Sequence, residues 1–519
     1  MSEIIKRPLI KSVDFCVDEN IWGHRLYDEQ LPHLTVLEFL GVLGSNLDTP
    51  LRPHDGLSGM VQFKPQRQMR LRGLLFNNPY VESIAASRLS DEDKWRQWLD
   101  KFGQGSTGNG DGPSDLAYLR ESFASFDDFA KTIELMRSSS FESRSNKRWS
   151  SKFVFPFGPD ALYEDLQIDA RGNMSNDRRF FARTGELLYL MLTRAERGAE
   201  LGDILAKRLF DRSAPMNRLA RALQGSPQLP EEPRVSGYLP EVSNPRFDQI
   251  CEDWIAILSR DIPIYDALEH LIAITGLNML LYFLERAKHI SGDDEPVEFI
   301  CEIVSKDGRK VRSLSGDSYL ANQGFPEKAI RAHIESIRSQ QAWIDAGLTE
   351  FPDAERVKLL RETFQWPPSD DKDEEGYASR NPEELVSKLV ELALPRHSQH
   401  VGKIHAAWSR AIGLSSRRLS RRYRYAPNDR LLKSIVIAIV SDRMQFDEFL
   451  VEAKRRYGLV IGDAEGIHLV EAKYIDQAEL SENRDNLEAR FVGLSLVRRL
   501  SDSCSFVENP FVSEAGVAC

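Results

Sequence analysis

The residues best suited to bind a ligand form a basic run near the end of the chain. The run contains Arg417, Arg418, Arg421, Arg422, Arg424, Arg430 and Lys433, and its one carboxylate is Asp429. Each guanidinium offers a fork of donors and a fixed positive charge, so a phosphate backbone is a natural partner. If the run is helical, Arg417, Arg421 and Arg424 share one face. The run therefore predicts contact with DNA, with pairing to an acidic stretch at 370–375 or to a partner protein as the alternative.

A second group of residues could bind a metal ion. Asp463 stands ahead of the triplet Glu471-Ala472-Lys473, which follows an apolar run. This arrangement resembles the half-site of the PD-(D/E)xK nuclease family, and the resemblance implies that the acids hold Mg²⁺ and activate a water. Two features depart from that family, because Asp463 falls in a turn and the neighbouring segments have helical patterns. The competing interpretation places Glu471 and Lys473 on an exposed helical turn.

Other catalytic patterns are incomplete. His397, His400 and His405 are close in sequence, but no further ligand completes a zinc set, and we expect them in a surface loop. The glycines at positions 103, 105 and 108 follow a predicted helix and not a strand, so they indicate a linker and not a dinucleotide fingerprint. Cys251 and Cys301 lie in apolar segments typical of buried thiols. We expect no cofactor and no resident metal, and the sequence favours a non-catalytic role over an enzyme.

The elements that must position the basic run are helical. Apolar periodicity predicts helices near 429–440, 445–457 and 482–493, followed by a hairpin at 494–511. Helix, helix, helix and hairpin is the order of a winged-helix domain, a fold that contacts DNA in many proteins and only other proteins in others. Arg498 and Arg499 fall on the first strand of the wing and extend the predicted DNA-binding surface.

The last fifth of the chain carries a further set of short segments. They are RYGLVIG at 456–462, NLE at 486–488, LSD at 500–502 and FVENPF at 506–511. With these segments the chain is similar to the endings of uncharacterised proteins from bacterial anti-phage defence gene clusters. The resemblance implies a setting, namely a bacterial multi-protein defence system, and it implies no activity and no site residue.

The composition is that of a globular protein with an acidic balance. The 519 residues have a net charge of -11, which argues against a wholly basic coat, so any nucleic-acid contact must be local. Five scattered cysteines indicate reduced thiols, and the first residues lack the apolar segment of a signal peptide, so we expect a cytoplasmic protein. The apolar run at 264–288 contains Asp266, Glu269 and His270, which favours a buried core helix over a membrane span.

Length and breaker residues predict a mainly α, multidomain chain with small β-hairpins. We expect an N-terminal α+β region at 1–102, a glycine-rich linker at 103–113, a helical domain at 114–224, a proline-rich linker at 225–245, a helical domain at 246–366 that includes a β-hairpin at 298–314, an acidic linker at 367–382, and a helical, winged-helix-like domain at 383–519. The hairpin prediction rests on alternating apolar residues around a Lys306-Asp307-Gly308 turn.

Three functions are compatible with these patterns. The first is a non-catalytic subunit of a bacterial multi-protein system, which binds DNA or a partner protein through the basic C-terminal module. The second is a metal-dependent nuclease that uses Asp463, Glu471 and Lys473. The third is a purely structural scaffold. We expect other protein subunits as partners, and neither a membrane nor a small-molecule cofactor.

Overall fold

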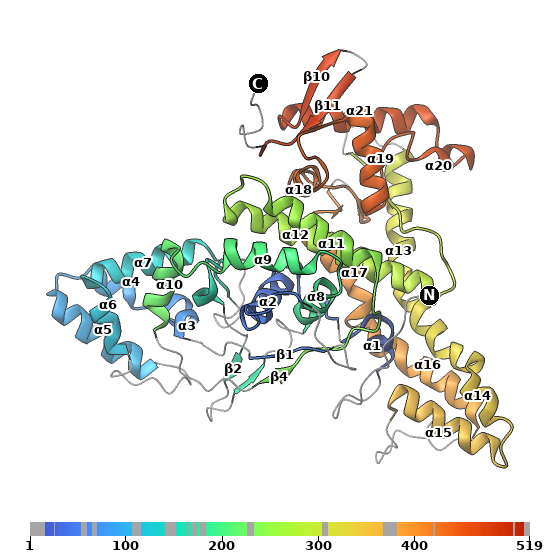
Figure 1. Cartoon of the computed structure of the whole chain (residues 1–519), viewed down its shortest axis with the longest axis horizontal. Coiled ribbons are helices and arrows are strands. Elements are labelled where there is room, and N and C mark those ends of the chain that lie inside the picture. Colours follow the sequence, from blue (N-terminus) through green and yellow to red (C-terminus); the bar gives the residue numbers. More distant parts are fainter. Residues whose placement is uncertain are drawn as a thin grey trace.

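The computed structural model has a central helical layer from which an N-terminal lobe, an arm and a C-terminal lobe extend (Figure 1). It describes residues 16–24, 26–52, 60–64, 70–105, 116–140, 152–162, 166–168, 174–176, 183–225, 233–303, 310–366, 381–418, 421–501 and 504–512. The predicted mainly α fold class is confirmed, and the strands are two to five residues long.

The central layer is organised around α12 (Ile264–Ile290). This helix is apolar on nearly all sides and packs against α2 (Pro32–Gly44), α11 (Pro245–Leu258) and α17 (Val401–Ala411). Among the described helices it alone has the length and apolar composition to cross a membrane, and 94% of its most apolar window is buried inside the protein. A helix that is apolar all round belongs in a core, so the predicted core helix is confirmed.

The contact between α2 and α8 (Thr184–Thr193) is tight at the start of α8, which leads on to α9 (Gly198–Leu209). The first N–H groups of a helix have no partner within the helix, so other groups must bind them. Glu38 of α2 accepts from the backbone N–H of Arg183 at 3.1 Å and of Gly185 at 2.7 Å. The side chain of Gln30 accepts from the N–H of Thr184 at 3.1 Å. Two side chains distant in sequence therefore cap α8.

The N-terminal lobe consists of short helices around an aromatic core. The helices are α3 (Arg70–Phe76), α4 (Val81–Ala85), α5 (Asp91–Gly105), α6 (Ala117–Ser122), α7 (Phe126–Ser138) and α10 (Pro215–Gln224). Trp95 and Trp98 of α5 are buried against Phe129 of α7, with ring centroids 5.1 Å and 4.8 Å apart. Helix α5 continues to Gly105, so the expected linker begins later than position 103, and its part at 106–113 lies outside the described residues.

The arm begins with α13 (Lys310–Glu335), which starts beside the C-terminal lobe and continues past the central layer (Figure 1). At its far end lie η4 (Ser336–Ser339), α14 (Gln341–Ala346) and α15 (Pro352–Phe364), and α16 (Pro382–Ser398) returns alongside. The predicted helix start at Pro382 is confirmed, and the Asn381 side chain accepts from the N–H of Glu383. Helix α1 (Val17–Trp22) packs against both α12 and α13.

The C-terminal lobe contains α18 (Asp429–Ile439), β8 (Arg443–Gln445), α19 (Phe446–Tyr457), α20 (Ile467–Glu471), α21 (Gln477–Gly493), β10 (Val497–Ser501) and β11 (Cys504–Glu508). The three strands form one antiparallel sheet in the order β10-β11-β8. The helices predicted near 429–440, 445–457 and 482–493, and the hairpin predicted at 494–511, are confirmed. The first turn of α21 was not predicted, and α20 corresponds to the helical turn of the competing interpretation of Glu471 and Lys473.

The β-hairpin predicted at 298–314 is wrong. The strand β5 (Phe299–Ile300) pairs in parallel with β9 (Leu459–Val460) of the C-terminal lobe, and residues 310–314 are the first turns of α13. The expected turn at 306–308 lies outside the described residues. Alternation over a few residues resembles a helix face as well as a strand, and the real partner strand is far along the chain. The other small sheets pair β1 (Gln62–Phe63) with β4 (Arg234–Val235) and β2 (Leu166–Ile168) with β3 (Met174–Asn176).

The proline-rich segment at 225–245 is not simply a linker. Its strand β4 pairs with β1, and residues 236–241 are buried. Most buried apolar side chains of the described residues form one continuous cluster, which runs from Val17 to Val507. The expected domain boundaries therefore stay a prediction, because the core does not divide along them in this part of the chain. Residues 367–380 of the expected acidic linker lie outside the described residues.

Candidate nucleic-acid interface

The first half of the basic run is a hairpin and not the helix that its arginine spacing suggested. The strands β6 (Ser415–Ser416) and β7 (Arg424–Tyr425) pair in an antiparallel register, and we call residues 415–425 the arginine hairpin. Positions 419 and 420 lie outside the described residues. The base is closed by the N–H of Ala426, which donates to the carbonyl of Leu414 at 2.8 Å. The shared helical face expected for Arg417, Arg421 and Arg424 therefore does not exist.

Arg424 is an internal residue and not part of the surface. Its side chain is 1% exposed, and it forms an ion pair with Glu302, which lies just beyond β5. Glu302 also accepts from Nε of Arg312 at 2.7 Å, and its N–H donates to the carbonyl of Tyr425 at 2.9 Å. A second amino group of Arg424 donates to the carbonyl of Arg418 at 2.8 Å. Arg424 therefore fixes the backbone of the hairpin and cannot touch a ligand, so its assignment as a binding residue is wrong.

The remaining arginines of the hairpin are on the surface. Arg417, Arg418, Arg421 and Arg422 are all exposed. Arg417 lies over the ring of Tyr423, 5.5 Å from its centroid, and Tyr423 is stacked on the buried Tyr319 of α13. In the described part of the chain, no carboxylate lies within ion-pair distance of Arg417, Arg418 or Arg421. Other arginines of the lobe do have acidic partners, as Arg484 has in Asp447 at 2.6 Å. Arg417, Arg418 and Arg421 thus carry positive charge that no carboxylate of the described residues neutralises.

Arg430 and Lys433 lie elsewhere, in the wall of a cavity of about 510 Å³ between α12, α18 and the end of α21. The same wall contains Asp266, Glu269 and Asp429, so the cavity has mixed charge. Asp429 is held by Arg490 at 2.6 Å. The Nζ of Lys433 lies 5.0 Å from the ring centroid of Phe511, which also lines the cavity. These two basic residues therefore do not extend the charge of the hairpin tip.

His270 in that cavity is held in one tautomer. Ser434 Oγ donates to the carbonyl of Arg430 at 2.8 Å, so Nδ1 of His270, 2.8 Å away, must donate to Ser434 Oγ. Burial, and then the nearby Lys433, lower the pKa of His270 to about 4. The ring is therefore neutral near pH 7 and keeps Nε2 as an acceptor.

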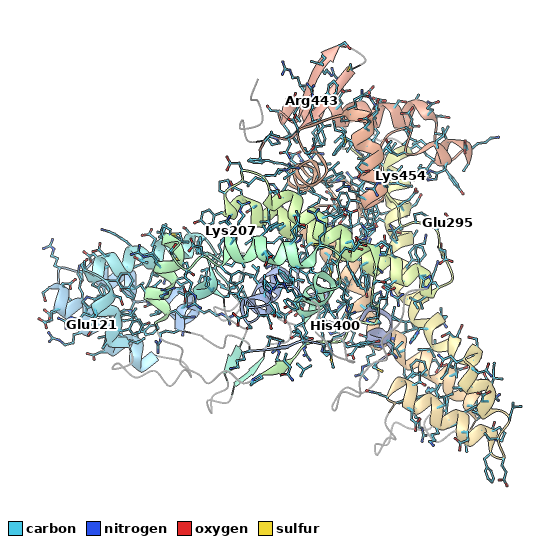
Figure 2. All side chains as sticks on the ribbon, in the orientation of Figure 1. Glu121, Lys207, Glu295, His400, Arg443 and Lys454 are labelled. Carbon is cyan, nitrogen blue, oxygen red and sulfur yellow. The ribbon has the colours of Figure 1, made fainter. Side chains whose placement is uncertain are left out.

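The predicted wing residues are exposed on β10. Arg499 is joined to Glu488 of α21 at 2.8 Å, whereas Arg498 has no ion pair within the described residues. Arg443 on β8 lies over the ring of Phe506, at the same sheet (Figure 2). Like the hairpin tip, this sheet presents arginines to solvent.

Helix α21, which packs against β10, has a different surface. Glu482 and Asp485 are exposed on it, while its two arginines, Arg484 and Arg490, are paired with carboxylates. Asp447 and Glu448 are exposed at the start of α19. A duplex brought against this helix would meet negative charge. Arg484 pairs with Asp485 of its own helix as well as with Asp447, whereas the pairing of Arg490 with Asp429 joins two elements and could not be predicted from the sequence.

The nuclease alternative requires a strand that leads to Glu471, but these residues form the helix α20. Glu471 is the last residue of α20, Lys473 follows in the left-handed region with φ 59°, and both are exposed. Asp463 accepts from the side chain of Gln477 at 2.9 Å, which lowers the pKa of the Asp463 carboxyl. No cluster of three or more metal-binding side chains occurs among the residues that the structure describes. The competing interpretation, an exposed helical turn, matches the observed placement.

The predicted surface loop is wrong for two of the three histidines, because His397 and His405 are buried on α16 and α17. His400 lies in the turn between these helices, where it is partly exposed and contacts Asp28 at 3.0 Å beside α1 (Figure 2). His405 Nε2 lies 2.6 Å from the hydroxyl of Tyr425, and burial lowers the pKa of His405 to about 3. This contact joins α17 to Tyr425, the last residue of the arginine hairpin. Sequence reasoning missed it because a polar residue on an amphipathic helix gives no sign of its partner.

The predictions for the cysteines hold. Cys251 and Cys301 are 0% and 1% exposed, and burial raises the pKa of Cys251 to about 12. Such thiols stay protonated and unreactive. Comparison of the chain with family models, with curated proteins and with solved structures finds no match.

Proposed function

We propose that the chain is a non-catalytic subunit that binds duplex DNA through its phosphate backbone, with the tip of the arginine hairpin as the principal contact. The observation that carries this proposal is that Arg417, Arg418 and Arg421 are exposed and have no acidic partner among the described residues, on a hairpin that Arg424 fastens from inside. In a chain with net charge -11, such a local concentration of free positive charge favours a polyanion.

The C-terminal lobe supports the same function as a winged-helix-like module. Its elements α18, β8, α19, α21, β10 and β11 follow the order expected of such a module, with β9 and α20 inserted between α19 and α21 and with β11 between β10 and β8. Arg498 on the wing would add a phosphate contact. The acidic face of α21 argues against reading bases in the major groove, where helix-turn-helix proteins place their second helix. The proposed binding is therefore independent of DNA sequence.

The cellular role within this proposal is that of a subunit in a bacterial anti-phage defence system. The similarity of the C-terminal segments to proteins of such gene clusters supports the setting. An acidic protein surface is the competing ligand of the hairpin.

The proposal is tested by a mobility-shift titration of the full chain on duplex DNA across a series of salt concentrations. Each phosphate contact contributes about -0.9 to the slope of log affinity against log salt, so reversing Arg417, Arg418 and Arg421 to Glu should reduce the slope by about 3. Arg424 is left intact because its removal would damage the fold. Two DNA sequences of equal length should bind alike.

A matched control reverses three exposed arginines of the N-terminal lobe, Arg88, Arg96 and Arg120, and changes the net charge equally. Exposed ion pairs contribute little to stability, so this variant should fold and bind as the wild type does. If the hairpin variant binds as tightly as this control, or if the wild type does not bind at low salt, the proposal is wrong and an acidic protein becomes the better ligand.

A further inference from the structure

The far end of the arm carries the two most exposed large apolar side chains of the described chain. Leu348 is 83% exposed and Phe351 is 66% exposed, and both lie in the turn between α14 and α15. Ile344 on α14 is 46% exposed. We call residues 344–355 the arm tip. A cluster of this kind on a soluble surface marks an interaction site more often than isolated exposed apolar residues do.

The arm tip is a firmly built turn. Trp343 is buried beneath it, and the guanidinium of Arg356 lies 5.3 Å from the centroid of its ring while Nε donates to the Trp343 carbonyl at 3.2 Å. Gly347 leaves room for the guanidinium of Arg356, which a Cβ at this position would approach to 2.2 Å. The N–H of Leu348 donates to the carbonyl of Asp345 at 3.0 Å. The apolar side chains are thus presented in a fixed arrangement, which lowers the entropy cost of binding.

The rim of the arm tip is acidic. Asp345, Glu350, Asp353 and Glu355 are exposed, and residues 344–355 contain no lysine or arginine. An anionic membrane or a nucleic acid would be repelled. The complementary surface must combine exposed apolar side chains with positive charge.

The chain itself carries such a surface on its wing. Leu500 is 61% exposed at a bulge of β10, an edge strand of its sheet that also exposes Arg498. Val492, 43% exposed, is the residue before the last of α21, the helix that packs against this strand. Arm tip and wing lie on different lobes at opposite ends of the molecule (Figure 1), so one chain cannot bring them together.

We propose that the arm tip of one chain docks on the wing of a second copy. Such a contact joins two different surfaces, so it is head-to-tail and leaves one free surface of each kind on every pair. Both patches are small, which places the interface at the low end of specific interfaces and makes the association weak. Opposite charge at the rim makes it weaker at high salt.

Sedimentation velocity of the full chain over a wide range of protein concentrations tests this proposal. The wild type should self-associate, and the double variant Leu348→Ser, Phe351→Ser should lose at least about tenfold in association constant, because a buried Leu or Phe contributes a tenfold step or more. Leu500→Ser on the wing should have a similar effect. Leu135→Ser, on the 49% exposed Leu135 of α7, is the matched control and should associate as the wild type does.

Mixing the two variants provides the decisive test. The arm-tip variant keeps an intact wing and the Leu500 variant keeps an intact arm tip, so each alone should be monomeric while their mixture forms a dimer that grows no further. A monomeric wild type, unchanged association of the arm-tip variant, or a mixture that stays monomeric would each overturn the proposal. DNA retention by the arm-tip variant, together with its circular dichroism, shows that it folds, and neither readout bears on self-association.

Discussion

Replacing Glu302 by Leu should open the arginine hairpin. Glu302 is 5% exposed and Arg424 is 1% exposed, and the carboxylate is the one acidic partner found for Arg424 among the described residues. Without it the guanidinium remains buried and keeps only the carbonyl of Arg418 as a fixed acceptor. Removing one member of a buried ion pair costs about 3–5 kcal/mol, because a buried charge is left uncompensated.

The opposite replacement should cost less. In an Arg424→Met variant, Glu302 still binds Arg312, whose side chain is 23% exposed and can carry the pair toward solvent. We expect a loss of about 1–3 kcal/mol for this variant. The double variant Glu302→Leu, Arg424→Met should recover part of the loss of Glu302→Leu, because apolar residues of similar volume often replace a buried pair without cost.

Hydrogen exchange measures these changes locally, which suits a chain of several lobes. The amide of Ala426 donates to Leu414 at the base of the hairpin and reports on its opening. A loss of 3–5 kcal/mol lowers its protection by about two to three and a half orders of magnitude. If Glu302→Leu lowers the protection less than about tenfold, or if Arg424→Met lowers it as much, the reasoning about the buried pair is refuted. DNA retention should fall in parallel, since the tip loses its support.

Two further predictions concern the start of α8. Burial, and then the nearby Glu186, raise the pKa of Glu38 from 4.5 to about 7, so the folded protein binds more protons than the unfolded chain between these values. The contribution of Glu38 to the free energy of unfolding should be full below pH 4.5 and should be lost as the pH rises through 7. The urea midpoint of a Glu38→Gln variant should lack this pH dependence. If the variant keeps the same dependence, another group causes it. Gly185→Ala places a Cβ 2.5 Å from that of Glu38 and 2.6 Å from the backbone nitrogen of Phe39, so it should cost about 1–3 kcal/mol in urea unfolding. Gly41→Ala on α2 meets nothing within 4 Å and should be neutral or stabilising, so equal costs at the two glycines would contradict the packing argument.

Local patterns were sufficient for the helices of the C-terminal lobe. The apolar positions of α18, α19 and α21 recur with the helical period, so their side chains find the core without information from elsewhere. The same holds for α12, whose apolar surface on all sides admits only a buried position. The hairpin at 494–511 was predictable because its two strands are adjacent in sequence.

At the candidate site, contacts with residues distant in sequence made the predictions from local patterns wrong. The spacing of Arg417, Arg421 and Arg424 fits a helix, but Glu302, more than a hundred residues earlier, draws Arg424 into the core and so favours a hairpin. The strand that begins at Phe299 pairs with Leu459 in place of its neighbour in sequence. Neither pairing produces a periodic pattern in the sequence, because each depends on only one or two residues.

By itself, then, the sequence determined the mainly helical class, the buried α12 and the position of an unusual concentration of arginines. These follow from periodicity, hydrophobicity and charge, which are properties of neighbouring residues. Only the tertiary structure decided which arginines are available to a ligand. Arg424 became part of the support, Arg430 and Lys433 part of a cavity wall, and Arg417, Arg418 and Arg421 stayed exposed at the hairpin tip with no carboxylate partner among the described residues. The physical reason is that the availability of a charge depends on the carboxylates that folding brings beside it.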